Sequence, residues 1–394
     1  MIAVNPKATQ TFADGVQTAH SVAYDARQAV QEIHAAFAAP DLKLVIFFCS
    51  REYDREALSE EMNRAFSGIP VVGCTTAGEF GAAGYRDHSL SAVSLAGEHF
   101  SVAVARIDGL AGFETSHGRE VAADLRRRLQ QAGSAATHED TFGLLLIDGL
   151  STREESVAGS LQNGLERIPL VGGSAGDGQA FQATYVFADG TFHSDRAALA
   201  LISTALPFTV MKTQHFVATD TRAVVTASDE HRVVREIDAW PAAEGYARLL
   251  GLDVGALDPS IFAKSPLVVV INGTNYVRSI QKANRDGSLT LYCAIEEGVV
   301  MRMVRGVDLF ENLENAFAEI RVEIGQPRLF IGFDCLLRRL DCARLGLIPQ
   351  VNELFRSNNV VGFNTYGEQF RGVHVNQTFT GVAIGSARAA DDDG

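Results

Sequence analysis

The stretch that decides the fold reads IPVVGCTTAGEF (residues 69–80), and it recurs as IPLVGGSAGD (168–177) and as NVVGFNTYGE (359–368). Each copy begins as a short apolar strand, continues into a polar turn bracketed by glycines, and ends at or next to an acidic residue. A segment that recurs in this way indicates a chain built from repeated structural units.

The flanks of the three copies repeat as well. An apolar strand precedes each copy, and between the two lies a stretch in which apolar residues recur at the spacing of a helix. A strand, a helix and a second strand in this order form a βαβ unit with parallel strands and a right-handed crossover. A third strand, rich in small residues, follows each turn. The expected strands are 42–49, 142–147 and 328–333, the helices 55–66, 154–166 and 348–356, and the third strands 90–95, 197–202 and 378–384.

The predicted fold class is therefore α/β, with two domains built on mixed sheets, repeated βαβ units and glycine turns at strand ends. The region between the second and third units differs, because it starts with alternating strand residues and continues through a helix at 241–250 and several hairpin strands. We place the domain boundary near residue 236. This gives a first domain at 1–236, a second at 237–386 and a disordered acidic tail at 387–394.

Composition and charge exclude several classes of protein. The net charge of −14 opposes binding to a phosphate backbone, and the one short basic cluster is Arg126 to Arg128, so nucleic acid is not an expected partner. No apolar run approaches the roughly 20 residues of a membrane span. The N-terminus lacks the pattern of a secretory signal. We expect a cytoplasmic protein whose five scattered cysteines are buried and reduced.

The glycine turns do not match catalytic or nucleotide-binding motifs. None has the G-x-x-x-x-G-K-[ST] spacing, and the segment from Gly172 to Gly176 is not the G-x-S-x-G elbow that presents a nucleophile. Glycines that tight bends require are the simpler explanation. The alternative is that three bends of one design converge at strand ends, where open α/β sheets bind ligands. Because no set of acid, base and nucleophile emerges, we expect no enzymatic activity.

Three of the ten histidines lie where they could hold an iron or line a pocket. His193 and His215 flank a strand-rich segment that closes the first domain. His374 alternates with valines on a strand that also carries Asn376 and Thr378. For each histidine alone, an ordinary hydrogen-bonded side chain is the simpler interpretation.

Several motifs, taken in order, resemble the FIST N and FIST C domains. The resemblance covers nearly the whole chain and is carried by the first two glycine turns and by FDCLLR (333–338), GEQF (367–370) and HVNQTFTG (374–381). It implies a sensory input module that binds a small ligand such as an amino acid. Members are often fused to kinase, cyclase or methyl-accepting segments. Since none of these is fused here, the resemblance implies output through a partner.

Chains of this kind also resemble the nitric-oxide-sensing haem proteins of the family. That resemblance implies haem b as cofactor, nitric oxide as signal, and a separately encoded histidine kinase as partner, with an effect on biofilm formation. A neutral imidazole would hold the iron. We assign this role to His215, whose neighbours Phe216 and Val217 could cover the porphyrin, with His374 as the main alternative. Arg278 would pair with the haem propionates.

The alternative function is a haem-free pocket for an amino acid or another small metabolite. Such a pocket would be a polar cleft lined by Arg278, Tyr366, Glu368 and Asn376, with Thr378 on the same polar row as Asn376. Absorbance near the Soret region distinguishes the two functions.

Overall fold

The computed structural model describes residues 10–11, 14–37, 39–229, 232–271 and 273–387. The chain forms two compact units. Unit 1 comprises Met1–Lys212, Glu314–Val373 and Phe379–Gly394, and unit 2 comprises Thr213–Leu313 and His374–Thr378. Apart from residue 387, the predicted acidic tail lies outside the described residues.

Unit 1 contains the three predicted βαβ units, and in each of them the two strands pair in parallel. The glycine that opens each turn, Gly73, Gly172 or Gly362, is the third residue of the second strand. The predicted repeat is therefore confirmed. The units are β3 (Leu42–Ser50), α2 (Arg55–Ala65) and β4 (Val71–Thr76); β8 (Thr141–Ile147), α4 (Glu154–Leu165) and β9 (Leu170–Ser174); and β22 (Leu329–Cys335), α8 (Leu336–Arg344), α9 (Ile348–Ser357) and β23 (Val360–Thr365).

Each βαβ unit belongs to a larger repeat, because a strand and a helix precede it and an antiparallel strand follows it. The three sheets share the orders β2-β6-β3-β4, β7-β12-β8-β9 and β13-β26-β22-β23. The third repeat is longer because most of unit 2 is inserted between β13 and α7. The added elements are β2 (Val16–Ser21), α1 (Ala26–Ala36) and β6 (Leu90–Ala96); β7 (Phe100–Asp108), α3 (Thr115–Gln131) and β12 (Arg196–Thr204); and β13 (Phe208–Gln214), α7 (Leu309–Ile324) and β26 (Thr378–Ile384).

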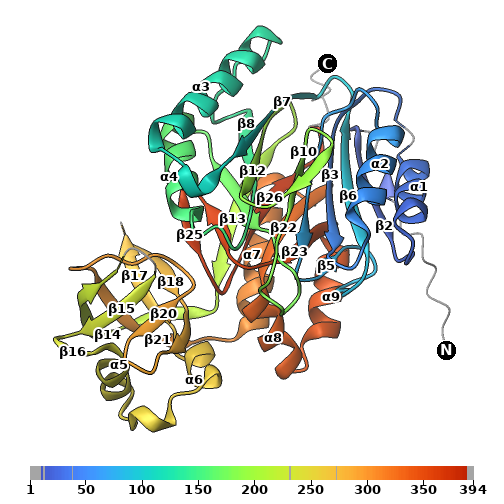
Figure 1. Ribbon diagram of the computed structural model, residues 1–394. Coiled ribbons are helices and arrows are strands. Elements are labelled where there is room, and N and C mark those ends of the chain that lie inside the picture. Colours follow the sequence, from blue (N-terminus) through green and yellow to red (C-terminus); the bar gives the residue numbers. More distant parts are fainter. Residues whose placement is uncertain (1–9, 12–13, 38, 230–231, 272, 388–394) are drawn as a thin grey trace, which may run out of the picture. The chain divides into compact units, whose positions relative to one another are not determined.

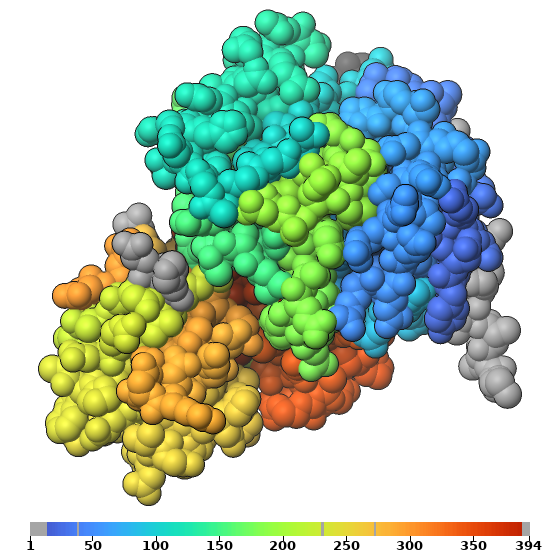
Figure 2. Space-filling view, viewed as in Figure 1, coloured from blue at the N-terminus to red at the C-terminus, as the bar shows by residue number. Residues whose placement is uncertain are grey.

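A short strand from another repeat extends each sheet. β5 (Glu79–Phe80) of the first repeat pairs with β23 of the third, and β10 (Val186–Ala188) of the second pairs with β4 of the first. β24 (Glu368–Phe370) of the third repeat pairs with β9 of the second. The exchange is cyclic, so the three repeats are joined in a closed ring. In Figure 2 the first repeat is blue, the second runs from teal to green, and the helices and last strands of the third are orange-red.

The central core of unit 1 is shared by all three sheets. Alternate side chains of the first strands point into it, among them Ile46, Leu144 and Ile331, whereas Val45 and Leu145 face helices on the outside. Figure 1 shows α1 and α2 on the outer face of the first sheet and α3 and α4 on that of the second. Strands covered on both faces must be apolar throughout, which explains the continuous apolar runs in the sequence.

A carboxamide side chain connects each pair of neighbouring repeats. In each βαβ unit the carboxamide residue lies in the helix, the same number of residues before the second strand. Its side chain contacts a glycine in a hairpin of another repeat. These glycines have φ near +80°, and an added Cβ would lie about 2.6–2.7 Å from the carboxamide side chain, so a larger residue would strain the backbone and displace the carboxamide. The pairs are Asn63 with Gly190, Gln162 with Gly372, and Asn352 with Gly84.

Unit 2 is a largely antiparallel sheet with the strand order β18-β17-β21-β14-β15-β20-β19, to which β16 is added beside β15. Its apolar core includes Val225, Tyr246, Phe262, Leu289 and Met301. Its elements are β14 (Phe216–Ser228), β15 (Val233–Ile237), β16 (Trp240–Pro241), α5 (Ala242–Leu250), the 3₁₀ helix η2 (Val254–Ala256), α6 (Pro259–Lys264), β17 (Leu267–Ile271), β18 (Thr274–Arg278), β19 (Ile280–Ala283), β20 (Leu289–Leu291) and β21 (Val300–Gly306). The remaining short elements of the chain are β1 (Gln10–Thr11), η1 (Leu110–Gly112), β11 (Thr191–His193) and β25 (Val373–Val375).

The compact units divide the chain elsewhere than near residue 236. Ile331 and Val382 follow that residue in sequence but lie in the core that Ile46 and Leu144 also fill, whereas β14 precedes it and pairs with β21. Burial of shared apolar surface groups these segments irrespective of their order in the chain. Among the helices that the structure describes, none has both the length and the apolar composition of a membrane span.

Candidate functional site

The segment His374–Thr378 carries three of the predicted site residues. It belongs to unit 2, whereas the chain on either side of it, Glu314–Val373 and Phe379–Gly394, belongs to unit 1. We call it the return segment, because here the chain re-enters unit 2. His374, Asn376 and Thr378 are all at most 1% exposed, so any role they have is that of buried groups.

Arg278, another predicted site residue, reaches the return segment from the end of β18. Its side chain is buried, and Nη1 donates hydrogen bonds to the carbonyl oxygens of Val277 at 3.2 Å and His374 at 3.3 Å. The next residue, Ser279, donates from Oγ to Oε1 of Gln377 at 2.7 Å. Two predicted residues, Arg278 and His374, are thus brought into direct contact.

Two further side chains complete this cluster. Cys293 is fully buried, and its thiol hydrogen-bonds to Oδ1 of Asn376 and lies 3.9 Å from the carbonyl oxygen of His374. Gln377 donates from Nε2 to the carbonyl oxygen of Ala263 at 2.8 Å. The sequence indicated Cys293 only as a buried thiol, because nothing local places it beside the return segment.

The return-segment cluster combines a guanidinium, an imidazole, a thiol, two amides and a hydroxyl within one part of unit 2. Such a set can hydrogen-bond a small polar or anionic ligand, since Arg278 supplies a fixed positive charge in a fork of N–H donors. Imidazole and thiolate are also the groups that most often hold haem iron. The cluster can therefore recognise a ligand.

His215, the residue predicted to hold iron, lies between β13 and β14, near the start of unit 2. It is 7% exposed, its ring packs on that of Phe216 at a centroid distance of 4.2 Å, and its carbonyl oxygen accepts from the amide of Val307 at 2.9 Å. Phe216 thus packs on the imidazole, while Val217 is 41% exposed; their predicted role in covering a porphyrin stays a prediction.

The other two predicted residues, Tyr366 and Glu368, belong to the third glycine turn, in unit 1. Glu368 is fully buried and accepts a hydrogen bond from Oγ1 of Thr365 within its own turn. In the first turn, Glu79 accepts from Thr76 at the same spacing. Both acids therefore stabilise the turns that carry them.

Tyr366 connects the third turn to the second. Its hydroxyl donates to Asp177, and its ring stacks on Phe181 with centroids 4.3 Å apart. Burial would raise the pKa of Asp177, but hydrogen bonds from Tyr366 and from the backbone amides of residues 181–183 outweigh it and lower that pKa. Asp177 thus remains ionised and holds this loop.

Glu79 in the first turn has the opposite electrostatic environment. It is fully buried, and burial raises its pKa from 4.5 to about 8, although Thr76 and Ser89 donate hydrogen bonds to it. The carboxyl group is therefore protonated at neutral pH. A protonated acid in this position supplies a hydrogen-bond donor as well as acceptors.

A buried ion pair lies close to this turn. Asp334, at the end of β22, accepts from Nε of Arg338 at 2.9 Å, and both side chains are at most 1% exposed. The hydroxyl of Tyr85 also donates to Asp334. This pair fixes the start of α8 at the carboxyl end of the third sheet.

The three glycine turns converge, which was the alternative to the simpler explanation that tight bends require these glycines. The amide of Gly176 in the second turn donates to the carbonyl oxygen of Thr75 in the first, at 2.9 Å. Ala77 of the first turn and Tyr366 of the third share a small apolar cluster with Leu336. Turn residues thus contact one another at the point where the repeats meet.

A cavity of about 630 Å³ lies elsewhere in unit 1, beside α2 and β7. Its walls include Phe66, Val104, Arg128 and Phe187. None of the predicted site residues lines it, and sequence patterns gave no indication of it.

Two family descriptions match this chain. Residues 43–239 match the FIST N domain and residues 242–371 match the FIST C domain. The uncharacterized protein MJ1623 of Methanocaldococcus jannaschii is 22% identical over 383 residues, which cover 86% of this chain and 73% of that protein.

Solved structures give weaker likenesses. A cyanuric acid hydrolase from A. caulinodans has a TM-score of 0.33 at 10% identity and covers 94% of this chain and 99% of its own. PurLQS from Thermotoga maritima has a TM-score of 0.19 at 10% identity, with 98% of this chain and 75% of that one covered. At such TM-scores neither likeness bears on fold or function. FIST domains are sensor domains of signal transduction, and the matches above show that this chain belongs to the FIST family.

Proposed function

We propose that this FIST protein is a sensor without catalytic activity, whose small ligand acts through the return segment. The observation that carries the proposal is the convergence of buried polar side chains on that segment, with Arg278, Ser279 and Cys293 contacting it from elsewhere in unit 2. Polar groups are costly to bury, and a few convergent ones are typical of binding sites.

The ligand that we propose first is haem b, with nitric oxide as the signal. His374 and His215 are buried imidazoles of the kind that holds haem iron, and Arg278 is a cation of the kind that pairs with propionates. When bound, the haem iron would supply the coordination position for nitric oxide. His374 is favoured over His215 as the iron ligand, because a ring nitrogen of His374 lies within 4.8 Å of the sulfur of Cys293 and its carbonyl oxygen accepts from Arg278.

A haem-free pocket for an amino acid or similar metabolite is the second candidate. It is favoured by the amide and hydroxyl groups of the cluster, since Ser279, Asn376 and Gln377 offer both donors and acceptors. A ligand with a carboxylate would pair with Arg278.

The connectivity of the chain supports a route for the signal. The return segment continues directly into β26, which pairs with β22 in unit 1. A ligand that favours one arrangement of the segment would therefore bias the strand that follows it, provided that the two arrangements bind the ligand with different affinities. The proposed receiver is a separately encoded histidine kinase in the cytoplasm, and we propose no role for nucleic acid.

Titration of the purified protein with haem tests the proposal. We expect a Soret band that saturates at a stoichiometric amount of haem, and an affinity at least about tenfold lower in Arg278→Met, since one charged pair contributes more than 1 kcal/mol when partly buried. Arg235→Met is the matched control, because Arg235 is an exposed arginine of the same unit, within 4 Å of Asp229 and Asp286.

Haem-free protein in a thermal-shift screen of amino acids tests the second candidate. A ligand that stabilises the wild type and Arg235→Met, but not Arg278→Met, would support it. If neither haem nor any amino acid binds, or if Arg278→Met binds like the wild type, the proposal that the return segment senses a ligand is refuted.

A further inference from the structure

The face of β14, β21 and β17 that points away from Met301 and the apolar core of unit 2 brings two arginines together, beside the buried Val268. In the antiparallel pairing of β14 with β21, Arg222 lies directly opposite Arg302, and Arg302 lies opposite Val268 of β17. Like charges in directly opposed positions of a sheet repel each other and destabilise the pairing. Arg222 is exposed and Arg302 is partly exposed.

Neither arginine is neutralised within the part of the chain that the structure describes. The ion pairs of the described residues include neither Arg222 nor Arg302, although Asp220 is only two residues from Arg222. A β-bulge separates Ala218 from Arg222 in the pairing with β21. Bulges redirect side chains and are common next to binding sites.

Beside the two arginines runs an apolar row on the same face. Val300 of β21 lies opposite Val224 of β14, and the register of β17 with β21 places Val270 next to Val300 on the other side. Val270 is 37% exposed and Val300 is 47% exposed. We call Val224, Val270, Val300, Arg222 and Arg302 the arginine face.

We propose that the arginine face binds a protein partner through a segment in which acidic residues lie beside apolar ones. This inference rests on the proposed function, which requires a partner protein to receive the signal. The proposal is supported by charge complementarity. The chain has a net charge of −14, yet the arginine face holds two adjacent cations that repel each other. Carboxylates of a partner would remove this repulsion, and the valine row would pack against the partner's apolar side chains.

The test measures binding of a short fluorescent peptide with the repeat Glu-Ser-Val-Ser to the full-length protein by anisotropy. This spacing places the acids and the valines on the same side of an extended peptide. We expect binding that weakens as salt is added. A peptide in which Lys replaces each Glu should not bind.

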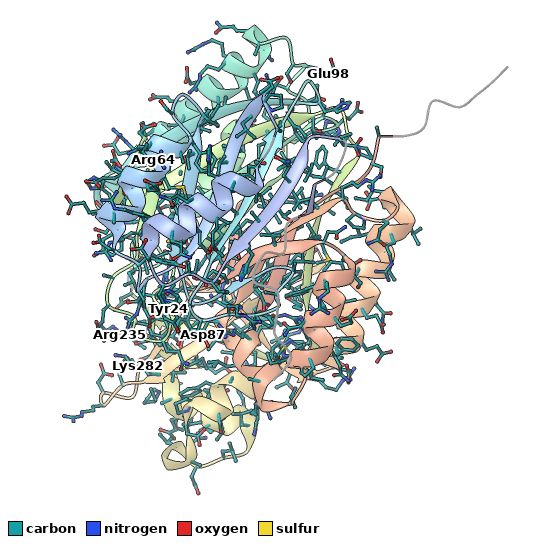
Figure 3. All side chains as sticks on the ribbon, turned by 90° about the vertical axis from the view of Figure 1, so that its right-hand side faces the viewer. Tyr24, Arg64, Asp87, Glu98, Arg235 and Lys282 are labelled. Carbon is teal, nitrogen blue, oxygen red and sulfur yellow. The ribbon has the colours of Figure 1, made fainter. Side chains whose placement is uncertain are left out.

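Arg302→Glu is the informative variant, because it places a carboxylate opposite Arg222. We expect it to weaken peptide binding about tenfold while leaving the protein at least as stable as the wild type, since opposite charges across a strand pair attract. A loss of binding then cannot be explained by unfolding. Lys282→Glu is the matched control, because Lys282, labelled in Figure 3, is an exposed cation of β19 in the same unit. It should bind like the wild type.

Unchanged peptide binding in Arg302→Glu, or equal loss in Lys282→Glu, would overturn the proposal. So would binding to vesicles that contain phosphatidylglycerol, lost in Arg302→Glu, without binding to the peptide, because the face would then recognise a lipid surface. The assay contains neither haem nor metabolite. If the ligand titrations fail, the peptide-binding result still stands. If the peptide does not bind, that outcome says nothing about the ligand site.

Discussion

Replacement of Glu79 by Gln should flatten the pH dependence of stability in unit 1. The carboxyl group of Glu79 is fully buried, and its pKa is raised from 4.5 to about 8 by burial. Between these pH values the unfolded chain ionises Glu79 while the folded protein keeps it protonated. The unfolded state then binds fewer protons, so stability must fall as pH rises.

The pKa difference gives the magnitude. A difference of about 3.5 pKa units at about 1.4 kcal/mol each corresponds to a loss on the order of 4 kcal/mol between pH 4.5 and 8. A neutral glutamine keeps the shape of the side chain without this titration. Glu79→Gln should therefore be less stable than the wild type near pH 5, because an amide NH2 replaces one of the two oxygens that accept from Thr76 and Ser89, and should overtake it as pH approaches 8.

Urea unfolding of both proteins at pH 5, 6.5 and 8 measures the effect. Glu98→Gln is the control, because Glu98, labelled in Figure 3, is exposed. It should follow the wild type at every pH. Parallel curves for the wild type and Glu79→Gln would refute the reasoning.

Three further substitutions test the packing of the repeats, each by urea or thermal unfolding. Gly78→Ala should destabilise the protein by at least about 1 kcal/mol more than Gly97→Ala. Both glycines have positive φ, but an added Cβ at Gly78 would meet the backbone oxygen of Arg86 at 2.9 Å and displace Arg339, whereas at Gly97 it would meet nothing within 4 Å; equal losses would contradict this. Arg338→Met should lower the free energy of unfolding by about 3–5 kcal/mol, because Asp334 then stays buried without its ion pair. Adding Asp334→Asn should restore part of that stability. A double variant no better than the single one would speak against a charge effect. Asn352→Ala should lower the free energy of unfolding by about 1–2 kcal/mol, because the backbone amide of Tyr85 loses the side-chain oxygen that accepts from it at 3.0 Å. Stability within error of the wild type would mean that water replaces this acceptor.

Much of unit 1 could be predicted because its signals are local. The strand expected at 42–49 is β3 (Leu42–Ser50), and the helix expected at 154–166 is α4 (Glu154–Leu165). Strands buried on both faces and helices with one buried face leave patterns within a dozen residues. The repeat then supplied the order of these elements.

The pairing of short strands could not be predicted in the same way. In the sequence repeat, Asp177 aligns with Glu79 and Glu368. In the sheets, however, the residue of the second repeat that is equivalent to these two acids is Val186. The three equivalent pairs are Glu79 with Phe363, Val186 with Cys74, and Glu368 with Gly173. Strands of two or three residues carry too little pattern to indicate a partner far away in the chain. For the same reason the compact units do not follow a single boundary.

The candidate site was partly predictable. Polar residues alternating with valines marked the return segment, and Arg278 was expected beside the ligand. That Arg278, Ser279 and Cys293 meet this segment depends on the tertiary fold of unit 2, which brings residues about 80 to 100 positions apart into contact. Tyr366 and Glu368 were expected in the same pocket, yet their hydrogen bonds to Asp177 and Thr365 lie within the glycine turns of unit 1.

The central claim is that a ligand binds at the return segment, and the visible spectrum of histidine variants tests it most directly. Haem is added to the wild type and to His374→Ala, His215→Ala and His193→Ala, and each ferrous protein is then exposed to nitric oxide. The exposed His193 serves as the control. We predict that His374→Ala loses the Soret band and the nitrosyl spectrum while His193→Ala keeps both. An unchanged spectrum in His374→Ala, together with loss in His215→Ala, would contradict the claim and place the ligand away from the return segment.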